Sequence, residues 1–361
     1  MGLLRLVLAF SVVVGHLNIA FPNDRFFHIF LINASSAVIC FFTVSGFYMA
    51  YVINEKYKFV DHWQKKFLIN RCLRLYPTYF FFLILCLVFQ IYFRVPNFLT
   101  GLKDMGAAHR ALNAFLNFSI VGQDIYVMFL ETKGIDPLRV MPIAQAWSIA
   151  VELELYVVAG FLFATRFGLL TTLCIGVVLR LVMQYFGLIV PPIGHMFIFN
   201  VLIFFAFGGC AYILYKRIEA WPVIARAAIA GFLTTALLAY TWHYDGFWEI
   251  EARGDDYHCT LFYLGLALAI PFIFSLSRKS RLDNFLGNLS YPVYLCHGLV
   301  VNVLSHAYAN SKFISKFLPS WDTLLTFTIH DIILVFFVSY LAYKWVEEPI
   351  QRVRTKLVLN K

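Results

Sequence analysis

The chain has 361 residues, of which 61% are hydrophobic, 18% aromatic and only 14% charged. This composition excludes an ordinary soluble domain. The net charge of +9 would suggest nucleic-acid binding in a soluble protein, but in a membrane protein basic residues report orientation, so we expect no nucleic-acid partner. The seven cysteines form no Cys-x-x-Cys pair and most lie in apolar runs, so we expect neither a disulfide framework nor a metal site.

The chain is predicted to be an all-α polytopic membrane protein with about ten transmembrane helices. A hydrocarbon core about 30 Å thick requires about 20 apolar residues per helix. The stretches that meet this requirement lie near residues 2–20, 34–53, 72–93, 146–164, 169–186, 196–215, 223–242, 258–276, 286–304 and 325–345. The first of them lacks the cleavage site of a signal peptide and is interpreted as a retained helix.

The distribution of Lys and Arg predicts that both termini are cytoplasmic, because most of these residues then lie on the inner side. Residues 94–145 form the one long outer connection, with room for a short re-entrant or interfacial helix. Pro349 is expected to end the last helix at the inner surface. We therefore predict one transmembrane domain over residues 1–350 and a basic cytoplasmic tail at 351–361, with no soluble second domain and no internal repeat.

Arg5 and His16 are the first candidates for function, because a charged side chain inside the membrane costs about 2.5–3.5 kcal/mol on insertion scales. Eleven residues separate them, which places both on one face of the first helix, about 16 Å apart along its axis. Arg5 then lies at the cytoplasmic end and His16 near the middle of the bilayer. The structural alternatives are surface anchoring for Arg5 and a packing role for His16.

The fourth span carries Ser148, Glu152 and Tyr156, spaced four residues apart and therefore on one stripe. Glu152 is expected at a depth close to that of His16. A carboxylate beside an imidazole would hold its tautomer and raise its basicity, as a general base for attack by a hydroxyl requires.

Two other spans carry polar residues, each of which has a functional and a structural interpretation. Arg71 and Arg74 lie three apart at the inner end of the third span and could bind the phosphates of a coenzyme A thioester, or merely anchor the helix. In the ninth span, Ser290, Tyr294 and His297 share a stripe. His297 is expected near the membrane centre, where it either binds substrate or satisfies neighbouring carbonyls.

Two further features are assigned structural roles. Arg180 lies in the middle of the fifth span and needs a partner, which Glu152 or Glu154 could supply as a structural ion pair. The small residues Ser45 and Gly46 in the second span are expected to let helices pack closely. Ser45 is not expected to be a nucleophile, because the Gly-x-Ser-x-Gly elbow is absent.

Together these residues resemble the acyltransferase 3 family, integral membrane acyltransferases that modify bacterial envelope polysaccharides and other exported glycans. The resemblance covers nearly the whole chain. It rests on Arg5-x10-His16, Phe-Phe-x-x-Ser-Gly-Phe at 41–47, Arg71-x-x-Arg74 with Pro77, Trp147-Ser148 followed by Glu152 and Tyr156, Ser290-Tyr291-x-x-Tyr294-x-x-His297, and Glu348-Pro349. Unlike larger relatives, the chain is expected to have no extracytoplasmic hydrolase-like domain, and the proline that often follows the segment 152–156 is missing.

The resemblance implies a ten-helix core in the bacterial inner membrane, surrounded by lipid, with acetyl-coenzyme A as the usual donor and no metal. It also implies a carbohydrate acceptor such as O-antigen, capsule or exopolysaccharide. His16 would be the central catalytic residue, with Glu152 as its partner or as a substrate ligand. Donor binding would fall to Arg5, Arg71 and Arg74. Apart from the resemblance, the positions of Ser148, Tyr156, Tyr294 and His297 make them candidates for substrate or oxyanion contacts, because the transition state needs an oxyanion donor.

A proton-coupled transporter or flippase is the main alternative, because buried His, Glu and Arg can also relay protons. That function predicts inverted repeats and interrupted helices, and the sequence has neither pattern. A membrane-embedded sensor or scaffold would leave the buried charges unexplained. The sequence does not determine the acylated hydroxyl, the acyl chain, the order of the chemical steps or the oligomeric state.

Overall fold

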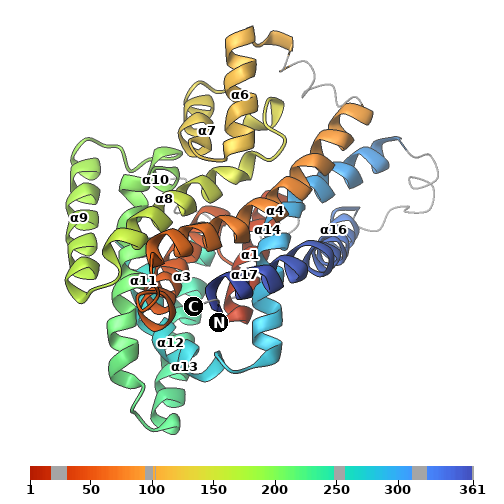
Figure 1. The fold of residues 1–361 in the computed structure, drawn as a ribbon. Helices are drawn as coiled ribbons and strands as arrows, with labels where there is room; N and C mark the ends of the chain where they lie inside the picture. The colour runs from red at the N-terminus through yellow and green to blue at the C-terminus, as the bar shows by residue number, and fades with distance from the viewer. Residues whose placement is uncertain (18–30, 94–100, 102, 248–256, 311–322, 360–361) are drawn as a thin grey trace.

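The computed structural model describes residues 1–17, 31–93, 101, 103–247, 257–310 and 323–359, which form helices and turns without a strand. A helix occupies each of the ten expected stretches (Figure 1). These helices are α1 (Gly2–Leu17), α3 (Ala34–Val52), α4 (Trp63–Tyr92), α8 (Trp147–Leu162), α9 (Arg166–Tyr185), α11 (Ile198–Ile218), α12 (Val223–His243), α13 (Tyr257–Ser277), α14 (Arg281–Asn310) and α16 (Thr323–Ala342).

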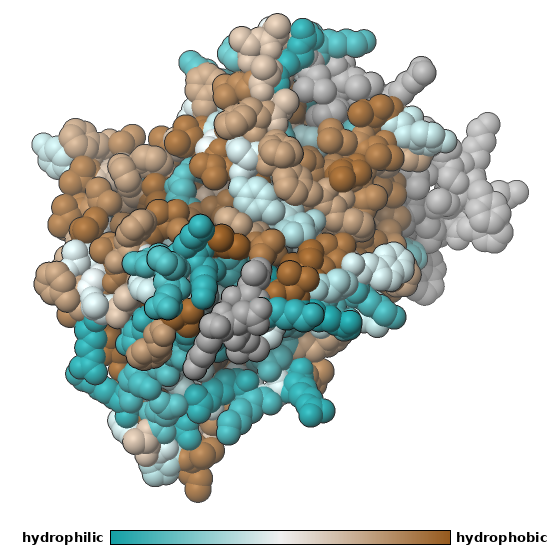
Figure 2. Space-filling model, viewed as in Figure 1, coloured by the Kyte–Doolittle hydropathy of each residue, from teal (hydrophilic) through white to brown (hydrophobic). Residues whose placement is uncertain are grey.

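The helices have the length and surface of a multi-pass membrane protein. Seven of them are long and apolar enough to cross a membrane, namely α3, α4, α8, α9, α11, α12 and α13. Large apolar side chains such as Phe167 and Ile224 are exposed, and lipid is the medium that would cover them. Figure 2 shows hydrophobic residues over much of the upper half of this face and hydrophilic ones concentrated in its lower half. The exact number of crossings and the side of each terminus stay predictions.

Helices α3 and α11 cross in close contact at the centre of the bundle. A Cβ atom built on Gly46 would lie 1.9 Å from the carbonyl oxygen of Phe205, and one on Gly208 would lie 1.8 Å from that of Thr43. Only glycine permits this approach of the two backbones. The packing role expected for Gly46 is confirmed.

Helices α1 and α14 start side by side at one end of the molecule. The Asp283 carboxylate accepts hydrogen bonds from the backbone N–H groups of Gly2 (2.8 Å) and Leu3 (3.0 Å). It thereby satisfies donors that the first turn of α1 leaves without partners. Because both helices begin at this level and pack along their length, residues equally far along them lie at similar depths.

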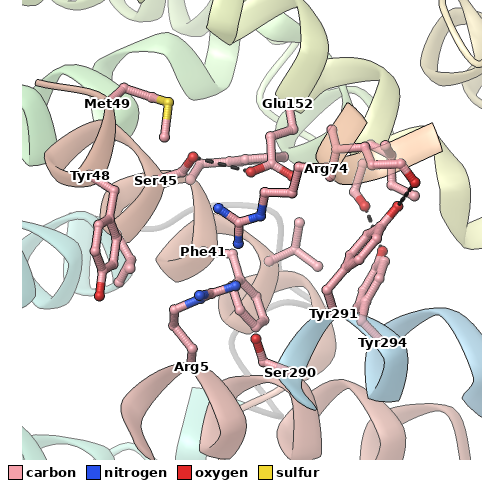
Figure 3. A pocket seen from close by; sticks show the side chains of 16 residues that line it. Arg5, Phe41, Ser45, Tyr48, Met49, Arg74, Glu152, Ser290, Tyr291 and Tyr294 are labelled. Carbon is pink, nitrogen blue, oxygen red and sulfur yellow. Dashed lines mark hydrogen bonds between the residues drawn. The ribbon is translucent and has the colours of Figure 1, made fainter. Parts of the chain in front are cut away.

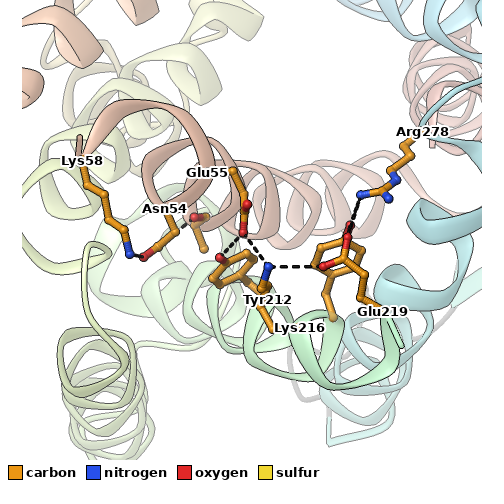
Figure 4. Close-up of polar contacts among 9 residues, drawn as sticks. Asn54, Glu55, Lys58, Tyr212, Lys216, Glu219 and Arg278 are labelled. Atoms are coloured by element: carbon orange, nitrogen blue, oxygen red, sulfur yellow. Dashed lines mark hydrogen bonds and ion pairs between the residues drawn. The ribbon is translucent and has the colours of Figure 1, made fainter. Parts of the chain in front are cut away.

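A polar network ties together the ends of α3, α11 and α13 (Figure 4). It begins in the π-helical segment η1 (Ile53–Tyr57) that continues α3. Glu55 accepts from the Tyr212 hydroxyl at 2.6 Å and pairs with Lys216 at 3.1 Å. Lys216 also pairs with Glu219, which in turn pairs with Arg278 (3.2 and 3.1 Å). Linked ion pairs of this kind hold three helix ends in register.

The C-terminal segment differs from the expected tail. Helix α16 continues through the π-helical segment η6 (Tyr343–Glu347) into α17 (Glu348–Leu359), which packs against α4. Pro349 lies in the first turn of α17, where a helix needs no backbone N–H from it, so it begins a helix and does not end one. The expectation of a helix end at Pro349 is therefore wrong.

The long connection holds two short helices, α6 (Ala107–Ser119) and α7 (Gln123–Thr132), drawn at the top of Figure 1. Helix α6 exposes an apolar face that includes Phe115 and Phe118. A short helix with such a face suits the expected interfacial segment. Helix α7 contacts α8 and so borders the part of the bundle that contains the site.

Candidate functional site

Two adjoining cavities lie among α1, α3, α4, α8 and α14. The first, here called the basic chamber, has a volume of about 310 Å³ and is lined in part by Arg5, Lys56, Arg71, Arg74, Glu347 and Arg354. The second, the central cavity, is narrower, with a volume of about 70 Å³, and is lined in part by Phe41, Ser45, Ser148, Glu152 and Tyr294. Both are lined by Arg5, Tyr48, Arg74 and Tyr291. The two cavities therefore meet at these four side chains.

The basic chamber concentrates positive charge. Five basic side chains and one carboxyl line it, a formal charge of 5 − 1 = +4 when all are ionised. Two of these residues come from π-helical segments, Lys56 from η1 and Glu347 from η6. A π segment turns its side chains away from the face that α-helical spacing would give them. The chamber suits an anion with several charges.

Arg71 is the most buried of these cations, with 7% of the residue exposed. Its guanidinium lies over the rings of Phe67 and Tyr156, 5.6 and 6.0 Å from their centroids. Its Nε has no hydrogen-bond partner among the described residues. A buried donor without a partner is costly, and a ligand that accepts from it would remove that cost.

The amide of Asn70 links two arginines from different helices. Its Oδ1 accepts from Arg354 Nε and Nη2, at 3.2 and 2.9 Å, and from Arg71 Nη2, at 3.3 Å. Its Nδ2 donates to the Arg354 carbonyl oxygen at 3.4 Å. Helix α17 is thus attached to α4 at the wall of the basic chamber.

Burial and neighbouring charges shift the pKa values of Arg354 and Glu347. Burial, with Arg74 and Arg71 adding repulsion, lowers the pKa of Arg354 to about 9. Burial raises the pKa of Glu347 to about 7, although Arg74 and Arg5 oppose that shift. The chamber therefore gains positive charge as Glu347 takes up a proton near neutral pH.

Glu152 lies in the wall of the central cavity between a serine and a tyrosine. Its carboxylate accepts from the Ser45 hydroxyl at 3.2 Å and from the Tyr156 hydroxyl. Figure 3 shows Arg5 and Arg74 pointing toward one another, with Glu152 and Ser45 beside Arg74. The negative charge of Glu152 offsets part of the repulsion between the two guanidinium groups. Ser45 thus has a polar partner as well as its expected place in the packing.

Ser148 and Tyr294 meet at the far side of the central cavity. The Tyr294 hydroxyl lies 2.6 Å from Ser148 Oγ, and each hydroxyl lies within reach of the Gln145 carbonyl oxygen (2.9 and 3.2 Å). Whichever hydroxyl donates to that carbonyl, the other can donate to its neighbour, so both protons are used within the cluster. This arrangement leaves neither group a free donor for an oxyanion.

The two histidines form a pair behind Tyr294. The ring centroids of His16 and His297 are 4.9 Å apart, and those of Tyr294 and His297 are 5.9 Å apart. His16 Nδ1 lies 2.8 Å from the Val12 carbonyl oxygen, and His297 Nδ1 lies 2.6 Å from that of Tyr294. Because a carbonyl only accepts, each Nδ1 carries a proton, so Nε2 is the nitrogen that lacks one whenever the ring is neutral. His297 is buried, whereas His16 is exposed.

The structure does not bring His16 and Glu152 together. The described contacts of Glu152 are with Ser45 and Tyr156, and it shares the central cavity with Arg5. The reason is the depth of α8, because Gln145, just before this helix, already contacts Leu295 on α14 (3.2 Å). Glu152 lies about 10 Å farther along α8, so it is level with the start of α1 and not with His16.

Arg180 is also placed differently from the expected ion pair. It donates to the Asn200 carbonyl oxygen at 3.4 Å and lies 5.2 Å from the ring of Phe204. Among the described residues, no ion pair joins it to Glu152 or Glu154. Helix α9 packs mainly against α11, which directs Arg180 away from the glutamates on α8.

Four residues at the site were missed in the sequence, namely Asn70, Gln145, Glu347 and Arg354. Asn70 directly precedes Arg71, and this adjacency was the available signal. Glu347 and Arg354 were assigned to the end of a helix and to a tail, because neither η6 nor the packing of α17 on α4 follows from hydropathy. Gln145 was missed because it precedes a span that was expected to begin at the outer surface, which would place this residue outside the bundle.

The comparison with known families agrees with this geometry. The acyltransferase 3 family model, described as an acyltransferase domain, matches residues 1–355. The match includes every residue named above in the two cavities and the histidine pair. No curated protein and no solved structure matches the chain. The resemblance that the short motifs carried is confirmed, and the chain belongs to the acyltransferase 3 family.

Proposed function

We propose that the protein transfers an acyl group, with acetyl expected, from cytoplasmic acyl-coenzyme A to a hydroxyl of an extracytoplasmic carbohydrate in the bacterial inner membrane. The expected acceptors are O-antigen, capsule or exopolysaccharide. One observation carries the proposal: the basic chamber adjoins the central cavity, and Tyr294 in the wall of that cavity packs against the histidine pair. Along α14, His297 lies about 15 Å beyond Gly287, which lines the basic chamber.

The donor would bind with its phosphates in the basic chamber, where Arg71 and Arg74 provide charged donors. Its pantetheine arm would pass Arg5 and enter the central cavity, which α1, α3 and α14 enclose. The thioester would then reach Tyr294, which stands between this cavity and the histidines. The acyl group, and not the whole donor, would thus cover the remaining distance to the outer side.

The histidine pair supplies the group that such a transfer requires. An unprotonated Nε2 can take the proton of an acceptor hydroxyl while the hydroxyl oxygen attacks the carbonyl carbon of the thioester. The carbon–sulfur bond then breaks and the thiolate leaves with the proton from the ring. Alternatively, Nε2 of His16 attacks the thioester first, and the acceptor takes the acyl group from the ring. In both cases the Nδ1 hydrogen bond to the helix fixes the tautomer.

We expect His16→Ala and His297→Ala each to reduce acetylation of the envelope polysaccharide by at least about 100-fold, the range for loss of a general base or nucleophile. Mass spectrometry of polysaccharide from cells with the gene, without it, and with each variant measures this. His62→Asn is the matched control, because His62 is exposed, lies outside both cavities and has a positive φ of 53° that asparagine tolerates. Unchanged acetylation in the His16→Ala strain would reject the proposal.

Labelling with acetyl-coenzyme A in the absence of acceptor separates the two chemical routes. An acetyl-histidine intermediate predicts label on the wild-type protein and none on His16→Ala. Direct attack by the acceptor predicts no label on either. Both results are compatible with acyl transfer, so this experiment decides only the order of the steps.

A further inference from the structure

The basic chamber has a wall that the proposed function does not explain. Arg354 reaches it from α17, a helix beyond the last span, and is held there by Asn70 on α4. Arg352, only two residues earlier, is exposed and pairs with Glu348 at 2.8 Å. The two arginines thus differ in environment although they share one helix turn.

The hydrogen bonds around Asn70 leave specific donors unused. The amide oxygen has two lone pairs, and three N–H groups from two guanidiniums already approach it. Among the described residues, neither Arg71 nor Arg354 forms an ion pair, and Arg71 Nε lacks any partner. Two adjacent cations without a carboxylate of their own favour binding of an anion between them.

We infer that Asn70 and Arg354 form a clamp that presents Arg71 and Arg354 together to the phosphates of a nucleotide donor, so that the C-terminal helix supplies part of the donor site. This inference rests on the proposed function in naming acyl-coenzyme A. The clamp would recognise the nucleotide end of acyl-coenzyme A, which carries the phosphates. A thioester of pantetheine alone, which has no phosphate, would not engage it.

Direct binding of coenzyme A tests the clamp apart from catalysis. With purified protein in phosphatidylcholine nanodiscs, we expect Arg354→Ala and Asn70→Ala to weaken coenzyme A binding by about ten- to a hundred-fold, as loss of charge-assisted hydrogen bonds predicts. Arg352→Ala is the control from the same helix and should change binding less than about two-fold. Equal losses in Arg352→Ala and Arg354→Ala would overturn the clamp, because they would reflect general charge.

Kinetics distinguish a donor clamp from a structural support. In Arg354→Ala, KM for acetyl-coenzyme A should rise by a similar factor while kcat stays within about two-fold, because Arg354 lines the basic chamber and, among the described residues, has no contact with the histidine pair. KM for S-acetylpantetheine should be unchanged. An equal loss with both donors would show that the variant damages the fold, and the inference would fail.

Anionic lipid headgroups offer the same phosphate chemistry, so the binding is repeated in phosphatidylglycerol nanodiscs. We expect the same affinity for coenzyme A in both. If phosphatidylglycerol abolishes binding by the wild type and not by Arg354→Ala, the chamber holds lipid and the inference is wrong. Wild-type binding that Arg354→Ala leaves unchanged would reject the clamp and leave the proposed function standing. Failure of the wild type to bind or use acetyl-coenzyme A would reject both.

Discussion

Glu347 shows how one side chain can tune the donor site. It accepts a hydrogen bond from the Thr78 hydroxyl at 3.4 Å and lines the basic chamber with Arg74 and Arg5. A carboxylate at this point competes with a phosphate for the same cations. A neutral carboxyl does not, so the protonation state of Glu347 sets the charge that an incoming anion meets.

Binding of coenzyme A should therefore weaken as Glu347 ionises. Burial raises the pKa of Glu347 to about 7, so the carboxyl is mostly neutral below this pH and charged above it. We expect the affinity of the wild type to fall by about three- to ten-fold relative to Glu347→Gln between about pH 6 and pH 8. Binding titrations of both proteins across this range measure the difference. The titration of the ligand's own phosphate affects both proteins equally and so cancels in the comparison. Parallel pH profiles would contradict this role for Glu347.

The sequence predicted which residues are candidates for function better than it predicted which residues they contact. His16, His297, Arg71 and Arg74 could be selected because charged or titratable groups are costly in apolar helices. Their partners depend on the depth at which each helix begins. Glu152 illustrates this, because hydropathy does not reveal that α8 starts inside the protein.

The crossing of α3 and α11 determines where Ser45 and its partner Glu152 lie. A methyl group on Gly46 would overlap the backbone of Phe205, and backbone cannot rotate away as a flexible side chain can. We expect Gly46→Ala to destabilise the protein by at least about 2 kcal/mol. Thermal unfolding in detergent measures this against the control Gly231→Ala on α12. A Cβ at Gly231 meets nothing within 4 Å, so this control should be neutral or slightly stabilising.

The helices themselves were predictable, but their ends were not. Length and hydropathy placed one helix in each of ten stretches, because about 20 apolar residues are needed to cross the hydrocarbon core. The π-helical segments η1 and η6 have no such signal, yet they carry Lys56 and Glu347 into the basic chamber. Sequence therefore defined the bundle and missed part of the wall of its donor site.

At the scale of the whole molecule, the two ends of the chain lie on one side. Arg5 near the N-terminus and Arg354 near the C-terminus line the same chamber. The histidine pair lies farther along α1 and α14, in the direction of α6 and α7. This polarity agrees with a donor that enters from the side of the termini and an acceptor that binds on the other.

Cysteine labelling tests this polarity directly. In a variant whose native cysteines are replaced, Thr355→Cys on α17 and Lys133→Cys at the end of α7 each provide one exposed thiol. The concentration of Lys and Arg near the termini predicts that Thr355→Cys faces the cytoplasm. A membrane-impermeant maleimide should then label Lys133→Cys in intact cells and Thr355→Cys only after permeabilisation. The reverse pattern would place the basic chamber outside, where no cytoplasmic thioester could reach it, and the route from arginines to histidines would run in the wrong direction for outward transfer.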